Sequence, residues 1–385
     1  MRFLALACIT IVGHLLVVGI LATGMTDKGA TERDFIAYWS AGQQLAHGAN
    51  PYDSRGIHLL EHGAGLSDDQ NLRIMRNPPD AFFLVLPLGF VGPTPGILLW
   101  LLALLASVSV SVGLLWTLNG RPDNYFHFLG YAFLPVITCF KAGQVGIFLL
   151  LGISLFAFLH RSRPFFAGTA LLLCAIKPHL FLPFGLVLIL WTAVHRQFRI
   201  LAGFCVALAA SCALSYHLDP PAWSQFSDLL RTGGVFDEPV PALSVYMRLL
   251  IDPHTVWLEF IPVTLACGWA VWYFWTRKDR WDWLDHGMLL LLVSVLCAPY
   301  SWLTDESVLL SAVLFGLYRA AEAGRSLVPL WIIGSAGLIE TISNVQLTTP
   351  YFLWTAPAWL GWYLYATGRI GIPKGRRSGE AVVAN

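Results

Sequence analysis

Asp34 is the first residue of this chain whose type and position suggest chemistry. It follows an apolar stretch, residues 3–21, that is long enough to cross a bilayer, and it stands in the first polar segment. Only 12% of the residues are charged. A carboxylate placed just outside the membrane, among aromatic and small side chains, is costly unless it has a task. Asp34 is therefore the first candidate for a catalytic base.

Two short turns carry lysines that could hold an anion. Lys177 and His179, with a proline between them, interrupt an otherwise apolar run over residues 165–194. The proline disfavours helical geometry at the lysine, which is thereby presented at a helix break. Lys141 and Gln144 stand in a second turn that contains a glycine. Each turn predicts a phosphate ligand, and the alternative is a lysine that snorkels toward lipid headgroups.

A late polar segment, residues 299–306, suggests contacts to a sugar. Tyr300 and Trp302 offer aromatic faces on which a sugar ring can stack. Asp305 and Glu306 follow, and their carboxylates can accept hydrogen bonds from sugar hydroxyls. The alternative is that both carboxylates stand in the first turn of a helix, where the helix dipole favours negative charge.

Three further residues complete the candidate set. Arg76 and Arg248 stand in the two largest polar loops, and each could bind a phosphate or anchor its loop to headgroups. Tyr38 stands close to Asp34 and is, like Gln144, a candidate for contacts to a sugar or an acceptor. No group of His, Cys or acidic residues has the spacing of metal ligands, so the sequence predicts no metal site.

The elements that must position these residues are membrane helices. The chain has 385 residues, of which 56% are hydrophobic, and its mean hydropathy is +0.64. A soluble domain carries about 25% charged residues, about twice the fraction found here. Aromatic residues gather near the ends of the apolar runs, as an interfacial belt requires. The net charge of +1 offers no basic field for a nucleic acid.

The apolar runs predict about twelve membrane spans, several of them shorter than a straight crossing needs and broken by proline. Their expected positions are residues 3–21, 96–118, 126–140, 145–160, 165–176, 180–194, 200–217, 256–276, 288–299, 307–318, 327–342 and 352–367.

Lys and Arg concentrate in alternate short loops, which places both termini in the cytoplasm and the candidate residues on the outer side. Two large outer loops, residues 24–77 and 218–254, bear juxtamembrane helices, one of them expected at residues 38–47. Residues 77–91 either cross the membrane or form a re-entrant or interfacial helix. Residues 1–370 are expected to form one transmembrane domain, and residues 371–385 a disordered cytoplasmic tail.

The order of the motifs resembles glycosyltransferase family 87, the DUF2029-type membrane proteins of the GT-C superfamily. Each motif is short, but their order and spacing together are fairly specific, and the resemblance covers about residues 3–318. The residues that carry it are Asp34-Phe35, Tyr38, Ala41-Gly42, Gly48, Pro51-Tyr52, Pro78-Pro79, Pro87-Leu88, Gly143-Gln144, Lys177-Pro178, and Pro299-Tyr300 with Asp305.

The resemblance implies a polytopic GT-C-like fold in the inner or plasma membrane, with its active site facing the periplasm or the outside. It implies a polyprenyl-phosphate sugar as donor, a lipid or glycan as acceptor, and no cofactor. Asp34 takes the role of catalytic base and Lys177 that of a ligand to the lipid phosphate, with His179, Lys141, Arg76 and Arg248 as further cationic candidates. Mannosyltransferases of the family carry two histidines after the Pro-x-Ser-Trp stretch. Here Thr304, Asp305 and Glu306 follow it, so the hexose stays open between mannose and a similar sugar.

Two other functions compete with a transferase. Broken helices and lysines at membrane depth also suit a transporter or flippase of a lipid-linked sugar. The absence of an internal sequence repeat, and the position of the polar residues at one face rather than at the midplane, count against transport. A non-catalytic scaffold in envelope assembly is the third hypothesis.

Overall fold

The computed structural model describes residues 27–67, 72–232, 240–343 and 349–370, together with the single positions 11, 15, 18, 19 and 22. Every regular element in these ranges is a helix, which confirms the all-α prediction. The predicted tail at residues 371–385 lies outside the described residues, as does the first span at residues 3–21 apart from those single positions.

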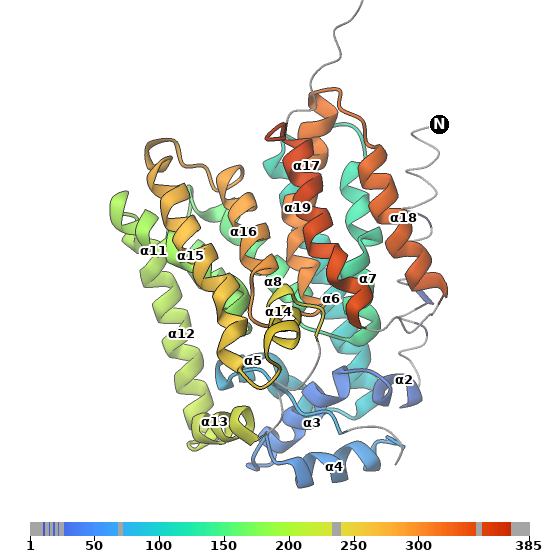
Figure 1. The fold of residues 1–385 in the computed structure, drawn as a ribbon. Coiled ribbons are helices and arrows are strands. Elements are labelled where there is room, and N and C mark those ends of the chain that lie inside the picture. Colours follow the sequence, from blue (N-terminus) through green and yellow to red (C-terminus); the bar gives the residue numbers. More distant parts are fainter. Residues whose placement is uncertain are drawn as a thin grey trace, which may run out of the picture.

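Short helices near the N-terminus gather at one end of the helical bundle (Figure 1). The helix predicted at residues 38–47 is confirmed as α3, which begins directly after Asp34 and packs on η2. The indole nitrogen of Trp39 on α3 donates to the carbonyl oxygen of Val91 at 2.9 Å. The elements of this end are α2 (Asp27–Thr31), α3 (Phe35–Ala46), α4 (Ser54–Gly63), η1 (Pro79–Ala81), α5 (Phe82–Val85), η2 (Leu86–Phe90) and, from later in the chain, α13 (Ala222–Thr232).

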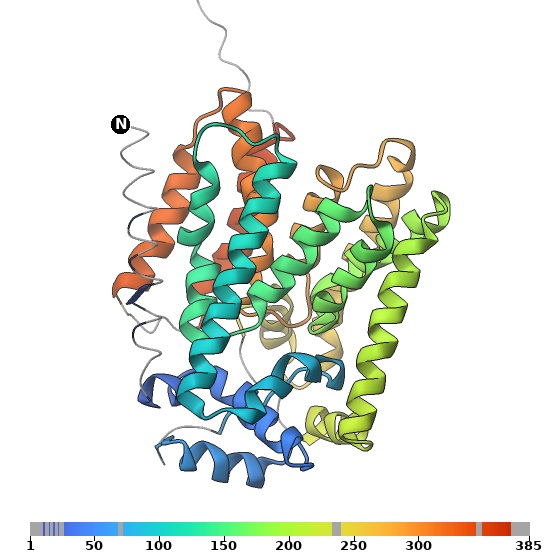
Figure 2. The ribbon, with the colours of Figure 1, turned by 180° about the vertical axis from the view of Figure 1, so that it is seen from behind.

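Three described helices are long and apolar enough to cross a membrane. They are α6 (Pro93–Leu118), α12 (Phe198–Leu218), and the run Val256–Trp275, which joins η6 (Val256–Glu259) to α15 (Phe260–Trp275). Seen from behind, α12 runs along one edge of the molecule with α13 at its foot (Figure 2). The apolar helices fit a membrane protein.

The other apolar helices are shorter, as the proline-broken runs predicted. Among them, Pro79–Phe90 is a chain of three short helices, which favours the re-entrant or interfacial alternative for residues 77–91. The number of about twelve spans stays a prediction. The remaining elements are η3 (Phe126–Ala132), α7 (Leu134–Ala142), α8 (Gly146–Leu159), α9 (Pro164–Ala170), α10 (Leu172–Ala175), η4 (Pro178–Phe181), α11 (Leu182–Val194), α14 (Leu243–Ile251), η7 (Lys278–Arg280), α16 (His286–Leu296), η8 (Asp305–Leu309), α17 (Leu310–Glu322), α18 (Val328–Ser343), η9 (Thr349–Trp354) and α19 (Thr355–Ala366).

Candidate active site

Asp34 stands at the start of α3 and is held by a side chain from the turn after α7. The amide nitrogen of Gln144 donates to Oδ2 of Asp34 at 2.9 Å, and the hydroxyl of Tyr38 donates to the amide oxygen of Gln144 at 2.7 Å. Gly143 has a φ of +69°, and a Cβ there would lie 2.8 Å from the Cβ of Phe35. The turn can therefore approach α3 only with a glycine at this position.

Lys177 lies at a helix break, as its following proline predicted. Its φ of −137° and ψ of 69° are not helical, and η4 begins at the next residue. The ammonium nitrogen of Lys177 is 2.6 Å from Oδ1 of Asp305, and Oδ2 of Asp305 accepts the backbone N–H of Trp302 at 3.0 Å. The side chain of Lys177 is 11% exposed and that of Asp305 is fully buried. This is a desolvated ion pair with both carboxylate oxygens engaged.

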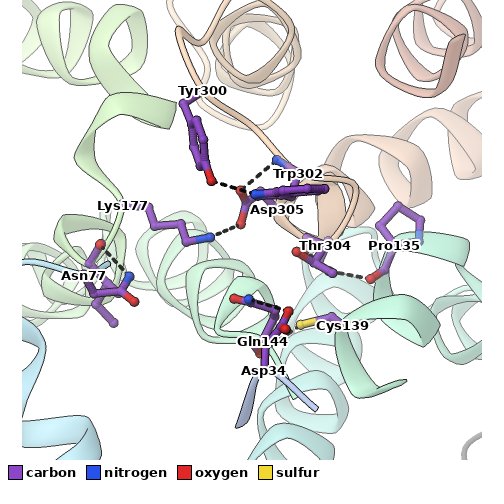
Figure 3. Close-up of polar contacts among 12 residues, drawn as sticks. Asp34, Asn77, Pro135, Cys139, Gln144, Lys177, Tyr300, Trp302, Thr304 and Asp305 are labelled. Atoms are coloured by element: carbon purple, nitrogen blue, oxygen red, sulfur yellow. Dashed lines mark hydrogen bonds and ion pairs between the residues drawn. The ribbon is translucent and has the colours of Figure 1, made fainter. Parts of the chain in front are cut away.

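The two groups of polar residues lie close together, although four separate segments supply them (Figure 3). The carboxylates of Asp34 and Asp305 both act on Tyr38, whose pKa is raised by burial first and then by these two charges. The late loop packs closely on the start of α8, and this approach requires Gly146, because a Cβ there would clash with the carbonyl oxygen of Thr304. The structure therefore brings Asp34, Tyr38 and Gln144 close to Lys177 and Asp305.

Two aromatic residues stand above the ion pair in Figure 3. The indole nitrogen of Trp302 donates to the hydroxyl of Tyr300 at 2.8 Å, and the ring of His179 meets that of Tyr300 edge-on at 5.9 Å. Both Tyr300 and Trp302 are partly exposed and pack against the apolar face of α14. Aromatic surfaces with adjoining hydroxyl and imidazole groups can stack on a sugar ring and bond its hydroxyls.

The structure gives two predicted site residues partners of their own. Arg248 on α14 is buried, and its Nε lies 2.6 Å from Oε1 of Glu259. Glu306 is buried as well, and its Oε1 accepts the hydroxyl of Thr355 at 2.7 Å. Lys141 is exposed in the last turn of α7. Arg76 is partly exposed.

Sequence reasoning missed Arg73. Its Nη1 lies 3.8 Å from Oδ1 of Asp34, and its backbone N–H donates to the buried carboxylate of Glu61 at 3.2 Å. It stands in a polar loop with no motif around it, so nothing in the sequence separates it from an ordinary surface arginine. Only the return of this loop to the start of α3 places Arg73 beside Asp34.

Among the described residues, no group of three or more His, Cys, Asp or Glu side chains could hold a metal ion. The polar groups at the site are one half-exposed carboxylate, an amide that orients it, the Arg73 guanidinium beside it, and a lysine paired with a second carboxylate. Such a set can accept a proton at one point and offset negative charge at another.

Comparison with known proteins gives one match. The model of a family described as glycosyltransferase family 87 matches residues 76–299. That range contains Gln144 and Lys177, whereas Asp34 and Asp305 lie outside it. No curated protein matches the chain, and no solved structure matches it.

Proposed function

This chain belongs to glycosyltransferase family 87, and from that premise we propose that it is an inverting hexosyltransferase. The donor is a polyprenyl-phosphate sugar carrying mannose or a similar hexose, and the acceptor is a hydroxyl of a lipid or glycan. The observation that carries the proposal is the convergence of the oriented Asp34 carboxylate and the buried Lys177–Asp305 pair from distant parts of the chain.

Asp34 is the base in this mechanism. The acceptor hydroxyl gives its proton to the Asp34 carboxylate as its oxygen forms a bond to the anomeric carbon. The bond from that carbon to the phosphate oxygen breaks, and its electron pair leaves with the lipid phosphate. Attack and departure take place on opposite faces of the sugar, so the configuration inverts. Gln144 and Tyr38 orient the carboxylate. The Gln144 amide donates to one oxygen of Asp34, Oδ2, and leaves the other, Oδ1, to take the proton of the acceptor.

Lys177 offsets the charge that grows on the departing phosphate. Before the donor binds, Asp305 holds the ammonium group in place and compensates its charge in a buried setting. We assign further contacts to the phosphate to His179, Lys141 and Arg76, and contacts to the sugar or acceptor to Tyr300, Trp302, Gln144 and Tyr38. The substrate contacts expected of Arg248, Asp305 and Glu306 stay predictions, since each of these buried side chains already has a partner within the fold.

We further propose a GT-C-like arrangement of about twelve membrane helices in the inner or plasma membrane, with the site facing the periplasm or the outside. The support is the clustering of Asp34, Lys177 and Asp305 away from the predicted inner loops, which carry most of the Arg and Lys residues. A donor with a polyprenyl anchor suits this placement, because it can reach a site on the periplasmic or outer side from the outer leaflet of the membrane.

The test is Asp34→Asn in proteoliposomes supplied with a labelled polyprenyl-phosphate hexose. Loss of a general base lowers the transfer rate by about 10²–10⁴-fold. Asp53→Asn is the matched control, because Asp53 caps α4 in the same outer region and accepts from two backbone N–H groups. Transfer by Asp34→Asn at the wild-type rate refutes the proposal. Movement of the lipid across the bilayer without any glycoside product supports a transporter instead.

A further inference from the structure

The guanidinium group of Arg73 has open hydrogen-bond donors beside Asp34. Its Nη1 is 3.8 Å from Oδ1 of Asp34, too far for a hydrogen bond, and that nitrogen is buried without a hydrogen-bond partner. Among the described residues, no side chain or carbonyl accepts from the guanidinium. A charged donor without an acceptor costs free energy, so this nitrogen is available to an acceptor atom of a ligand.

The position of Arg73 is fixed by the loop that carries it. Its backbone N–H donates to Oε2 of Glu61, a residue with no exposed surface. A few residues further on, the side-chain nitrogen of Asn77 donates to the carbonyl oxygen of Ile176 at 3.1 Å, and the hydroxyl of Tyr52 donates to the carbonyl oxygen of Asn77 at 2.8 Å. The backbone of this segment is therefore tied at both ends, which places the start of the Arg73 side chain beside Asp34.

Pairing with Asp34 alone does not account for this geometry. Arginine and carboxylate groups that pair directly do so at about 2.7–2.9 Å, often through two parallel hydrogen bonds. Here Gln144 takes one oxygen of Asp34, and Arg73 stands back from the other. The side chain of Arg73 is 28% exposed and that of Asp34 is 46% exposed, so a ligand can reach both. A planar guanidinium with open donors matches the geometry of a phosphate.

We propose that Arg73 binds a phosphate group of the acceptor, close to the hydroxyl that Asp34 deprotonates. This rests on the proposed function, because inversion puts the leaving phosphate on the face of the sugar opposite to Asp34. A cation next to Asp34 therefore lies on the acceptor side. The acceptor is accordingly a hydroxyl-bearing phosphate ester, either a phospholipid headgroup or a phosphorylated glycan.

The binding experiment uses the full-length protein in phosphatidylcholine nanodiscs, with polyprenyl phosphate in excess so that the donor site is filled. The probe is sn-glycerol 1-phosphate, and glycerol is its neutral counterpart. We expect saturable binding of glycerol phosphate only, weakened about tenfold or more by Arg73→Gln and partly restored by Arg73→Lys. Arg55→Gln, at an exposed arginine on α4, is the matched control and leaves binding unchanged. Retained thermal midpoints show that each variant is folded.

Nanodiscs containing phosphatidylglycerol separate the two sources of the phosphate. Competition by this lipid against glycerol phosphate indicates a phospholipid acceptor, and binding of the soluble probe without competition indicates a phosphorylated glycan. Equal binding by Arg73→Gln and wild type overturns the proposal, as does equal binding of glycerol and glycerol phosphate. Asp34→Asn keeps the binding in either case. If Asp34→Asn binds the probe and still transfers sugar at the wild-type rate, the proposed role of Asp34 is refuted. The proposed phosphate site at Arg73 is then unaffected.

Discussion

The buried ion pair between Lys177 and Asp305 allows a structural effect to be separated from a catalytic one. Its charged atoms are 2.6 Å apart, and its side chains are 11% and 0% exposed. At an effective dielectric constant of ~20, Coulomb's law gives an attraction of about 6 kcal/mol. Desolvation of both groups offsets much of this attraction. Removal of one partner leaves the other charge buried alone, which costs about 3–5 kcal/mol.

We therefore expect Lys177→Met and Asp305→Asn each to lower the free energy of unfolding by about 3–5 kcal/mol, measured by SDS titration in mixed micelles. The double variant should lose less than the more destabilising single variant, because no buried charge then lacks a partner. An asparagine at 305 can still accept the backbone N–H of Trp302. Sugar transfer should remain at least about 10²-fold below wild type in the double variant, since the Lys177 ammonium group no longer meets the departing phosphate.

Arg319→Met is the control for charge removal as such. Arg319 pairs with Glu322 on the surface, with side chains 54% and 62% exposed, so its loss should change stability by less than about 1 kcal/mol. If Lys177→Met is as stable as wild type, the Lys177–Asp305 pair is not desolvated as described. If the double variant regains transfer, Lys177 is not the phosphate ligand.

Two further predictions concern residues that position the site, Glu61 and Gly146. Burial raises the pKa of Glu61 on α4 to about 7, so between about pH 4.5 and 7 the folded protein holds a proton that the unfolded chain has released. The free energy of unfolding should therefore fall by up to about 3 kcal/mol as the pH rises through this window. Thermal midpoints measured at about pH 5 and about pH 8 should differ in the wild type, and Glu61→Gln should remove this pH-dependent difference. If the difference is unchanged in Glu61→Gln, Glu61 is not its source. Gly146→Ala should displace the loop at Thr304, destabilise the protein by about 1–3 kcal/mol and slow transfer, whereas Gly185→Ala, with no atom within 4 Å of the new Cβ, should do neither. Equal transfer rates for the two glycine variants would show that the loop tolerates displacement.

Local sequence patterns were enough to predict several parts of the site. The proline after Lys177 predicted the helix break, because proline restricts the backbone of the residue before it. The apolar run at residues 96–118 predicted α6 to within a few residues. Gly143 next to Gln144 predicted a sharp turn, which the positive φ confirms. Each of these features depends on neighbouring residues alone.

Long-range pairing could not be predicted in the same way. Lys177 and Asp305 are 128 positions apart, and the sequence does not say which carboxylate meets which cation. Arg248 was expected to bind a phosphate or to anchor its loop to headgroups, whereas its buried pairing with Glu259 depends on how α14 packs on η6. Arg73 was missed for the same reason, since its loop returns to Asp34 only in the folded protein.

The central claim is that Asp34 and Lys177 act on opposite sides of one anomeric carbon. Its most direct test is an electron cryomicroscopy structure of the protein with a non-hydrolysable polyprenyl-phosphate hexose analogue. The account predicts a phosphate oxygen within about 3 Å of the Lys177 ammonium nitrogen. It also predicts that the face of the anomeric carbon opposite the phosphate is turned toward Asp34. A phosphate bound away from Lys177, or on the same face of the sugar as Asp34, would contradict it.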